Sequence, residues 1–406
     1  MASGETHEKT RTFGPGTIIL TVLSVFGLSL VVYRWVVGLG PTTALTDGRG
    51  WGIWIGFDVL CGIALAAGAF SIAATVYIFH LKDFYPILRP TILTGFLGYA
   101  LAAFSIAIDL GFPQRIWHLM IHWNIHSPLF EVGWCVMIYA TVLALEISPI
   151  VFERFRLKTP LRMVRAITIP LVIAGIILST CHQSSLGTLF VLMPHRVHPL
   201  WYSGLLPLLF LISAIGAGLS MVIVESTLSS SGLNHRLENH LLARLAAAIP
   251  YVLGLYLAIR FIDLVVAGDT QYLFSGDFLS ISFWVENIFG VIVPIVLFSM
   301  PAIKRKPYRL FGTALLVVFG LVMNRLYISL VAFKAGPYAP TWEEMFITIG
   351  LVALGALIFT LASRNMPVFA EHEEAVTHKQ LEDKPVPEMT PVLSFSASTT
   401  DQVKSA

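Results

Sequence analysis

One apolar segment carries a histidine and a serine at a spacing that puts both on the same face of a helix. His182 and Ser185 stand one helical turn apart, and Gln183 lies beside them. Imidazole, hydroxyl and amide groups form hydrogen bonds with a carbonyl oxygen, and an imidazole or a carboxylate can deliver a proton. Glu131 lies at a comparable depth in the preceding apolar segment. This set suits a quinone headgroup, which takes up protons together with electrons, and it predicts Glu131 and His182 as the catalytic pair.

Ionisable residues gather near one end of the apolar segments. Asp58, Asp109, Glu131 and His182 come from four consecutive segments at similar depth. Burying such groups in a membrane is costly, so they are usually paired or functional. Together with Ser185 they predict a quinone-binding pocket that opens toward one membrane face. The alternative is that some of these side chains are merely interfacial.

Further charged residues lie near the same end of the segments, namely Arg34, Arg260, Asp263, Glu286 and Arg325. Arg260 and Asp263 are spaced i, i+3, so a purely structural ion pair explains them equally well.

A proton route from the opposite face needs polar side chains along the way. Tyr99 lies midway along the third segment, Glu225 lies in the inner half of the sixth, and Glu146 offers an alternative inner end of the route. Each residue also has a structural explanation, because Tyr99 can be a packed aromatic and Glu225 an interfacial carboxylate beside basic loops.

Composition fixes the environment that positions these residues. The 406 residues are 56% hydrophobic and 12% charged, with a mean hydropathy of +0.78, which is too apolar for a soluble domain. Stretches long enough to cross about 30 Å of hydrocarbon occur at 17–39, 53–79, 91–111, 128–148, 164–186, 201–225, 243–265, 279–300, 309–333 and 343–363. The predicted fold is therefore an all-α integral membrane protein with ten transmembrane helices in one domain, 17–365.

Lysine and arginine are distributed unevenly over the loops. Nineteen of the 26 lie on the side of the termini, four lie in the opposite loops, and three lie within predicted helices. Because cytoplasmic loops carry the excess of these residues, both termini are expected in the cytoplasm and the pocket faces outward. Residues 1–16 then form a cytoplasmic N-terminus, and the polar residues 366–406 form a flexible cytoplasmic tail.

The histidines do not match a haem site. A membrane b-type haem usually needs two histidines that face each other from different helices, and His182 is the histidine clearly placed within a predicted helix. Segment 198–202, HPLWY, is typical of the capped, aromatic start of the sixth helix.

Metal sites are not indicated either. Cys61, Cys135 and Cys181 form no CxxC motif, which argues against an iron-sulfur cluster or a zinc site. The histidines of loop 118–126, His118, His122 and His126, are spaced i, i+4, i+8 and share a face if that loop is helical. An interfacial helix that presents histidines to water is the more ordinary interpretation, so no metal is expected.

Several blocks of sequence resemble the NrfD (polysulfide reductase membrane subunit) family, in particular its HybB branch. They are WGIWIGFD at 51–58, HQSSLG at 182–187 with VHPLW at 197–201, AGD at 267–269 or SGDF at 275–278 before FWVE at 283–286, and SLVAF at 329–333 before PTWEE at 340–344. The resemblance runs from about residue 15 to 365.

The resemblance implies a haem-free, ten-helix, quinone-reactive subunit of a periplasmic nickel-iron hydrogenase in the cytoplasmic (inner) membrane. It implies two four-helix bundles, helices 2–5 and 6–9, with two peripheral helices. The implied partners are a ferredoxin-like iron-sulfur subunit and the large and small hydrogenase subunits. Menaquinone is the expected substrate, entering laterally between helices, and membrane lipid but no nucleic acid is expected to bind.

Three other functions compete with this interpretation. The same kind of subunit can serve another periplasmic oxidoreductase, such as a polysulfide or other molybdenum enzyme. A secondary transporter also has about ten helices, but its site commonly lies at the midplane between broken helices, whereas the ionisable residues here crowd one face. An inert membrane anchor leaves the four polar side chains at one depth unexplained.

Overall fold

The computed structural model describes residues 14–233, 237–336 and 338–369. Apart from two isolated β-bridges, the regular structure of these residues is helical, which confirms the predicted all-α class. Ten of the helices are long and apolar enough to cross a membrane, as predicted. The predicted cytoplasmic segments 1–16 and 366–406 fall almost entirely outside the described residues.

Ten spans follow one another along the chain. They are α1 (Pro15–Val37), a composite second span (Trp54–Ile78), α5 (Tyr85–Asp109), α7 (Pro128–Arg154), α9 (Thr168–Val191), α10 (Leu206–Leu233), α11 (Asn239–Ala267), a composite eighth span (Phe278–Ser299), a ninth span (Pro307–Val331) and α16 (Trp342–Asn365).

Three of the spans contain π-helical turns. The second comprises η1 (Trp54–Val59, π), α3 (Leu60–Leu65), α4 (Gly68–Ala73) and η2 (Ala74–Ile78, π); the eighth comprises α12 (Phe278–Asn287), η6 (Ile288–Ile292, π) and α13 (Val293–Ser299); the ninth comprises α15 (Pro307–Leu326) and η7 (Tyr327–Val331, π). The connecting helices are α2 (Leu39–Thr42), α6 (His118–Ile121), α8 (Lys158–Ala166), α14 (Pro301–Lys304) and the 3-10 turns η3 (Lys82–Phe84), η4 (Pro113–Arg115) and η5 (Asp269–Phe274).

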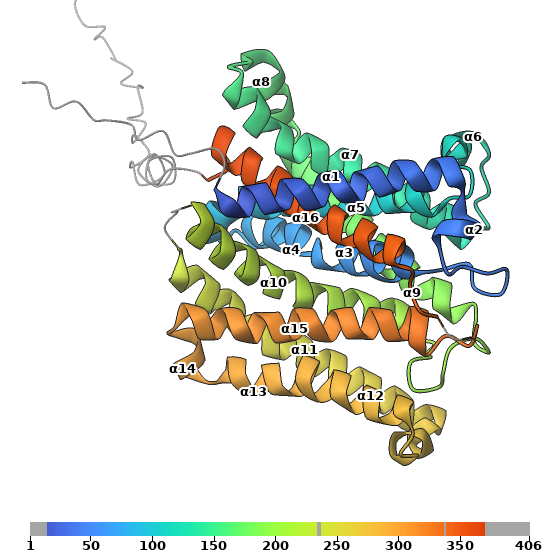
Figure 1. Ribbon diagram of the computed structural model, residues 1–406. Coiled ribbons are helices and arrows are strands. Elements are labelled where there is room, and N and C mark those ends of the chain that lie inside the picture. The colour runs from blue at the N-terminus through green and yellow to red at the C-terminus, as the bar shows by residue number, and fades with distance from the viewer. Residues whose placement is uncertain (1–13, 234–236, 337, 370–406) are drawn as a thin grey trace, which may run out of the picture. The chain divides into compact units, whose positions relative to one another are not determined.

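The spans pack as two groups of four. In the first bundle, α5, α7 and α9 pack around the second span, and in the second bundle α10 packs against α11 and α15, which both pack against the eighth span. Helices α1 and α16 lie against each other beside α5, and α10 joins the bundles through α9 and α4 (Figure 1). The predicted arrangement of two four-helix bundles with two peripheral helices is therefore observed.

Glycines let the helices approach closely at two seams. A Cβ on Gly68 would lie 2.7 Å from the carbonyl oxygen of Gly218, where the second span meets α10. A Cβ on Gly27 would lie 2.7 Å from the Cα atom of Gly350, where α1 meets α16. Without a hydrophobic driving force between helices in lipid, such close backbone packing is a main source of association.

Two helices begin several residues later than predicted, for identifiable reasons. The fifth span was expected from 164, but α8 continues to Ala166, and α9 begins at Thr168 after the chain turns at Ile167. The sixth was expected from 201 with an aromatic cap, but α10 begins at Leu206. Trp201 is not a belt residue, because its indole N–H turns inward and donates to Glu286 at 2.8 Å.

Long-range contacts tie the loops together on the side opposite the termini. The Arg49 side chain, 2% exposed, donates to the carbonyl oxygens of Leu330 at 3.1 Å and of Gly336. Glu344, at the capped start of α16, accepts from the Tyr338 hydroxyl at 2.7 Å and also from a backbone N–H of the first loop. These contacts fix the ends of the spans that carry the predicted site.

Candidate functional site

The interior of the first bundle contains aromatic polar side chains with unpaired atoms. His182 is fully buried, and neither ring nitrogen has a hydrogen-bond partner among the described residues. Its ring centroid lies 5.4 Å from that of Tyr99, which in turn lies 4.5 Å from that of Tyr139. Both tyrosine hydroxyls are buried and unpaired within the described part of the chain. Three groups that can donate or accept a proton therefore lie in series.

Two further residues of α9 contribute to this interior. The Gln183 amide nitrogen donates to the carbonyl oxygen of Ile63 at 3.0 Å, which anchors α9 to the second span. Ser179 and Gln183 face the Tyr99 hydroxyl, although without a hydrogen bond of normal geometry. Neither Ser179 nor Tyr139 was predicted from the sequence as part of a site. A signal existed for Tyr139, since it stands seven residues before Glu146, a spacing that places both on one face of α7.

The Glu131 carboxylate of the predicted pair meets Ser185 of the helix that carries His182. The Ser185 hydroxyl lies 2.5 Å from Glu131 Oε1 and can donate to it, while His182 stands one turn before Ser185 on α9. Glu131 belongs to the first turn of α7 and is exposed, whereas Ser185 is buried. The arrangement can pass a proton between the surface and the bundle interior.

Asp58 and Asp109 contact the peripheral helices. Asp58, in the π turn η1, accepts from the Thr348 hydroxyl of α16 at 2.8 Å. Asp109 ends α5 next to Arg34 of α1, whose guanidinium donates to the Leu110 carbonyl oxygen at 2.6 Å. The four residues of the predicted pocket thus divide, with Glu131 and His182 between α7 and α9, and the two aspartates facing α1 and α16.

The two predicted inner carboxylates occupy different seams. Glu146 lies next to Tyr139, since a Cβ on Gly175 would lie 3.5 Å both from Glu146 Oε1 and from the Tyr139 ring. Glu225 lies on α10 beside Thr94 of α5, and neither of its carboxylate oxygens has a hydrogen-bond partner in the described ranges. Glu146 therefore continues the series of rings toward the side of the termini.

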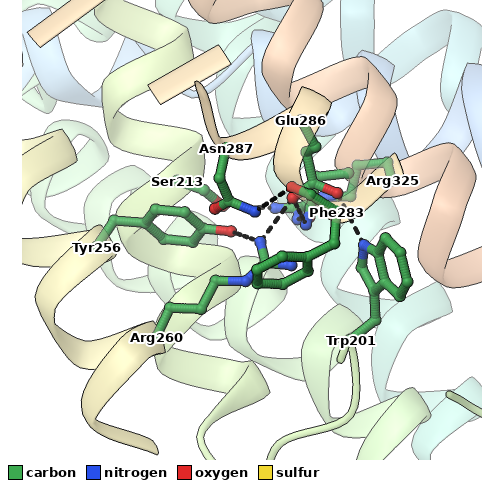
Figure 2. Close-up of polar contacts among 9 residues, drawn as sticks. Trp201, Ser213, Tyr256, Arg260, Phe283, Glu286, Asn287 and Arg325 are labelled. Carbon is green, nitrogen blue, oxygen red and sulfur yellow. Dashed lines mark hydrogen bonds and ion pairs between the residues drawn. The ribbon is translucent and has the colours of Figure 1, made fainter. Parts of the chain in front are cut away.

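The second bundle contains a charged cluster in which most groups are paired. Glu286, 1% exposed, accepts from Arg260 at 2.6 Å, from the Asn324 amide at 2.9 Å and from the Trp201 indole at 2.8 Å. The Arg260 guanidinium also donates to the Tyr256 hydroxyl and lies over the Phe283 ring, as Figure 2 shows. The structural explanation of Arg260 as an ion pair holds, but its partner is Glu286 and not the expected Asp263.

A second guanidinium completes the cluster. Arg325 donates to the Ser213 hydroxyl at 2.8 Å and to the side-chain oxygen of Asn324 at 2.6 Å, and it stacks 3.6 Å above the Phe210 ring. A cavity of about 20 Å³ beside the two arginines has room for about one water molecule. The depth of Arg260, Glu286 and Arg325 could be predicted from the sequence. Their hydrogen-bond partners could not, because contacts such as Arg260–Glu286 and Arg325–Ser213 join residues far apart in the chain.

The histidine loop adopts less helix than its spacing allowed. Helix α6 covers only His118–Ile121 and ends at His122, so the third histidine does not share its face. The rings of His118 and His122 lie 5.1 Å apart, with His118 half-buried and His122 exposed. Within the described ranges, His, Cys, Asp and Glu form no group of three arranged to hold a metal ion.

The sequence matches a known protein family over most of its length. The family described as "Polysulphide reductase, NrfD" matches residues 42–333. The chain belongs to the NrfD family. A protein of Nitratidesulfovibrio vulgaris is 42% identical over 70% of this chain and 75% of its own length. The "Probable Ni/Fe-hydrogenase 2 b-type cytochrome subunit" of Escherichia coli (strain K12) is 36% identical over 74% of this chain and 79% of its own. The "Menaquinone reductase, integral membrane subunit" of Nitratidesulfovibrio vulgaris is 29% identical over 69% and 71%.

One of these names includes a b-type cytochrome, so the histidines of this NrfD-family chain must be tested against a haem. His182 is the described histidine that is buried within a span, and its ring neighbour is Tyr99. The other described histidines lie in loops or at helix ends, at positions 80, 118, 122, 126, 195, 198 and 240. The described residues therefore do not supply the two histidines, facing each other at one depth, that a b-type haem needs.

Proposed function

We propose that this chain is the membrane subunit through which a periplasmic nickel-iron hydrogenase complex reduces menaquinone. The observation that carries the proposal is the imidazole of His182, which is buried next to Tyr99 without a hydrogen-bond partner among the described residues and stands one turn before the Ser185 that meets Glu131. Similarity to a hydrogenase subunit and to a menaquinone reductase subunit supports it. In this proposal the quinone is a substrate, and the described residues hold neither a haem nor an iron-sulfur cluster.

The chemistry assigned to the pair is hydrogen bonding followed by proton delivery. His182 donates a hydrogen bond to one quinone carbonyl and stabilises the charge that two incoming electrons place on it. Glu131 supplies a proton through the Ser185 hydroxyl, which is 2.5 Å from its carboxylate. Two electrons and two protons convert the quinone to the quinol. Positioned groups of this kind typically accelerate a proton transfer about 10²- to 10⁴-fold.

Asp58 and Asp109 complete the proposed pocket on the side of α16 and α1. Their carboxylates lie where a quinone entering laterally from lipid passes between the peripheral helices and the first bundle. Here they order the headgroup through hydrogen bonds before it reaches His182.

Glu131 supplies one of the two protons that the quinone takes up. The second proton comes through another carboxylate, from the side of the membrane on which the termini lie. The series of Glu146, Tyr139, Tyr99 and His182 supports Glu146 as the inner end of that route. Glu225 is the other candidate, since both of its oxygens are unpaired among the described residues. Proton uptake through either residue would couple quinone reduction to charge movement across the membrane.

We assign the site to the outer face of the inner membrane, with both termini cytoplasmic, on the uneven distribution of Lys and Arg. Electrons then arrive from a periplasmic ferredoxin-like iron-sulfur subunit that docks on the outer loops and receives them from the large and small hydrogenase subunits. Co-purification of the tagged chain followed by identification of its partners tests this assembly.

The deciding experiment is hydrogen-driven reduction of a menaquinone analogue by membranes that contain the wild-type complex, His182→Ala or Glu131→Gln. We expect each variant to lose at least about 100-fold in quinone reduction while hydrogen-dependent reduction of an artificial dye is retained. Thr188→Ala is the matched control, because Thr188 lies on the same helix and its hydroxyl bonds back to Ser184 at 3.1 Å. Normal quinone turnover in both site variants overturns the proposed site.

A second candidate is the same quinone chemistry in a different oxidoreductase complex, such as a molybdenum enzyme. The similarity to a menaquinone reductase subunit supports this candidate, because the name of that relative does not include a hydrogenase. Wild-type membranes without any hydrogen-dependent activity would select this candidate. Family membership favours both over a transporter.

A further inference from the structure

Helix α8 stands apart from the spans and has the composition of a membrane-surface helix. Its nine residues, Lys158–Ala166, connect α7 to α9 on the side of the termini, and Figure 1 shows it projecting away from the stacked helices. Lys158, Arg162 and Arg165 are spaced i, i+4, i+7 and therefore form one basic face. Val164 lies on another face and is buried against the protein.

The positive charge of this region is not fully neutralised by the described residues. Glu153 pairs with Arg165 at 2.9 Å, but the same carboxylate also binds Arg89 at 2.9 Å. Arg156, Lys158 and Arg162 are exposed and pair with no carboxylate among the described residues. One carboxylate therefore serves two arginines, and three further cations face outward.

Large apolar side chains are exposed among these cations. Phe155 is 66% exposed, Leu157 47% and Met163 67%. In water this juxtaposition of basic and apolar side chains is unfavourable, but at a bilayer surface the apolar groups enter the acyl boundary while the cations meet headgroups. Helix α8 is at that level because α7 ends just before it and α9 begins just after it.

The turn before α8 is held in one conformation. Arg156 has a φ of +55°, a left-handed conformation that non-glycine residues adopt rarely. Hydrogen bonds from the Arg156 N–H to Glu153 O at 3.2 Å and from the Leu157 N–H to Phe152 O at 2.9 Å fix it. The backbone that carries Arg156, Lys158 and Arg162 therefore has a defined conformation.

We infer that α8 and the turn before it form a binding surface for an anionic phospholipid, with the lipid phosphate on Arg156, Lys158 and Arg162 and the acyl chains on Phe155, Leu157 and Met163. Charge complementarity selects this occupant, because cations beside a membrane attract anionic lipid by about 1 kcal/mol each, which is about fivefold in affinity. The surface is independent of the quinone site.

The chain offers a matched control on the same side of the membrane. Lys304, Arg305, Lys306 and Arg309 form a second basic run, but Lys304 ends α14, Arg305 and Lys306 lie between helices and Arg309 lies in the first turn of α15, so no single helix presents these cations on one face. Replacing two cations in each run removes the same charge. The two double variants should therefore differ in lipid affinity only if α8 forms a specific lipid-binding site.

The test is native mass spectrometry of the detergent-solubilised complex, titrated with phosphatidylglycerol and, separately, with zwitterionic phosphatidylcholine. We expect wild type to retain phosphatidylglycerol preferentially, Lys158→Gln/Arg162→Gln to bind it about 30-fold more weakly, and Arg305→Gln/Lys306→Gln to bind it normally. Met163→Ser, which keeps every charge, should weaken retention by less. Thermal unfolding in lipid-free detergent checks that each variant is folded.

Four results would overturn the inference. Equal losses in both double variants indicate a general effect of surface charge, and equal retention of both lipids indicates apolar contact only. Displacement of the lipid by millimolar inorganic phosphate alone indicates a site for the free anion. Loss of another subunit in the α8 variant, with lipid retention unchanged, indicates that a protein covers this face.

Discussion

The two helix bundles bury polar side chains in opposite ways. In the first, His182, Tyr99 and Tyr139 lie in contact, and their polar atoms have no partners among the described residues. In the second, Glu286 accepts from three donors and is paired with Arg260. An unpaired buried polar group costs about 1–3 kcal/mol, and in the proposed function these groups contact the quinone or carry protons. The charged cluster instead joins α10, α11, the eighth span and α15 to each other.

The largest contrast is expected between two buried glutamates. Glu286→Gln leaves the Arg260 guanidinium buried without its counter-charge, so we expect a loss of about 3–5 kcal/mol in stability. Glu225→Gln, whose carboxylate has no partner among the described residues, should cost little or be stabilising. Denaturant or thermal unfolding of the purified complex in detergent measures both. Equal losses would show that the second bundle is not the paired one.

The seam between the bundles should tolerate no added side chain. In Gly68→Ala the new Cβ would meet the Gly218 carbonyl oxygen at 2.7 Å and a Val222 methyl at 2.9 Å. Overpacking of this kind costs about 1–3 kcal/mol. Gly254→Ala is the control, since nothing lies within 4 Å of a Cβ at that helical position. The same unfolding assay should find this control neutral or slightly stabilised.

Removing one hydroxyl from each bundle sharpens the comparison further. Tyr256→Phe removes an acceptor from the buried Arg260 guanidinium, and hydrogen bonds to charged groups contribute about 1.5–3 kcal/mol. Tyr139→Phe removes a hydroxyl that makes no hydrogen bond to the described residues, so its stability should be unchanged. If Tyr139→Phe is the more destabilised variant, the first bundle is held together by its polar interior after all.

The smallest expected effect concerns pH and the loop that brings Trp201 into the second bundle. Burial lowers the pKa of His198 below its ordinary value of 6.5, and its Nδ1 accepts from the Leu200 N–H at 3.3 Å. An unfolded chain binds a proton here more readily than the folded one, so stability should fall as pH drops below 6.5. His198→Gln should flatten that fall, while at about pH 7.5, where this histidine is neutral in both states, the variant's pH slope should match that of wild type. A melting series across pH shows whether the slope changes.

The spans could be predicted from sequence because an apolar run of about 20 residues is a strong local signal. The errors occurred where a side chain overrode the local pattern. Trp201 has the position of a membrane-belt aromatic, but Glu286, 85 residues later, draws its indole into the second bundle. Val164 and Ala166 are apolar residues close to the run of α9, yet they belong, with Arg165, to the amphipathic helix before it.

The candidate site could be predicted in part for the same reason. His182 and Ser185 share a helix face, which spacing alone predicts, and Ser185 meets Glu131 as their similar depth suggested. The Asp58 carboxylate and the Thr348 hydroxyl are 290 residues apart, and no local pattern indicates that pairing. Depth is readable from one sequence, but the direction in which a polar side chain faces around its helix depends on its neighbours.

The hydrogen bonds that the Arg49 side chain makes to a later loop have a consequence for biosynthesis. Its carbonyl partners at Leu330 and Gly336 follow 281 and 287 residues later in the chain. At about 5–20 residues per second, the ribosome makes them roughly 15–60 s after the arginine. Until then the Arg49 side chain lacks these acceptors, although the helices of the first bundle have already been synthesised. Any subunit that docks on these loops therefore meets their final shape only on fully synthesised chains.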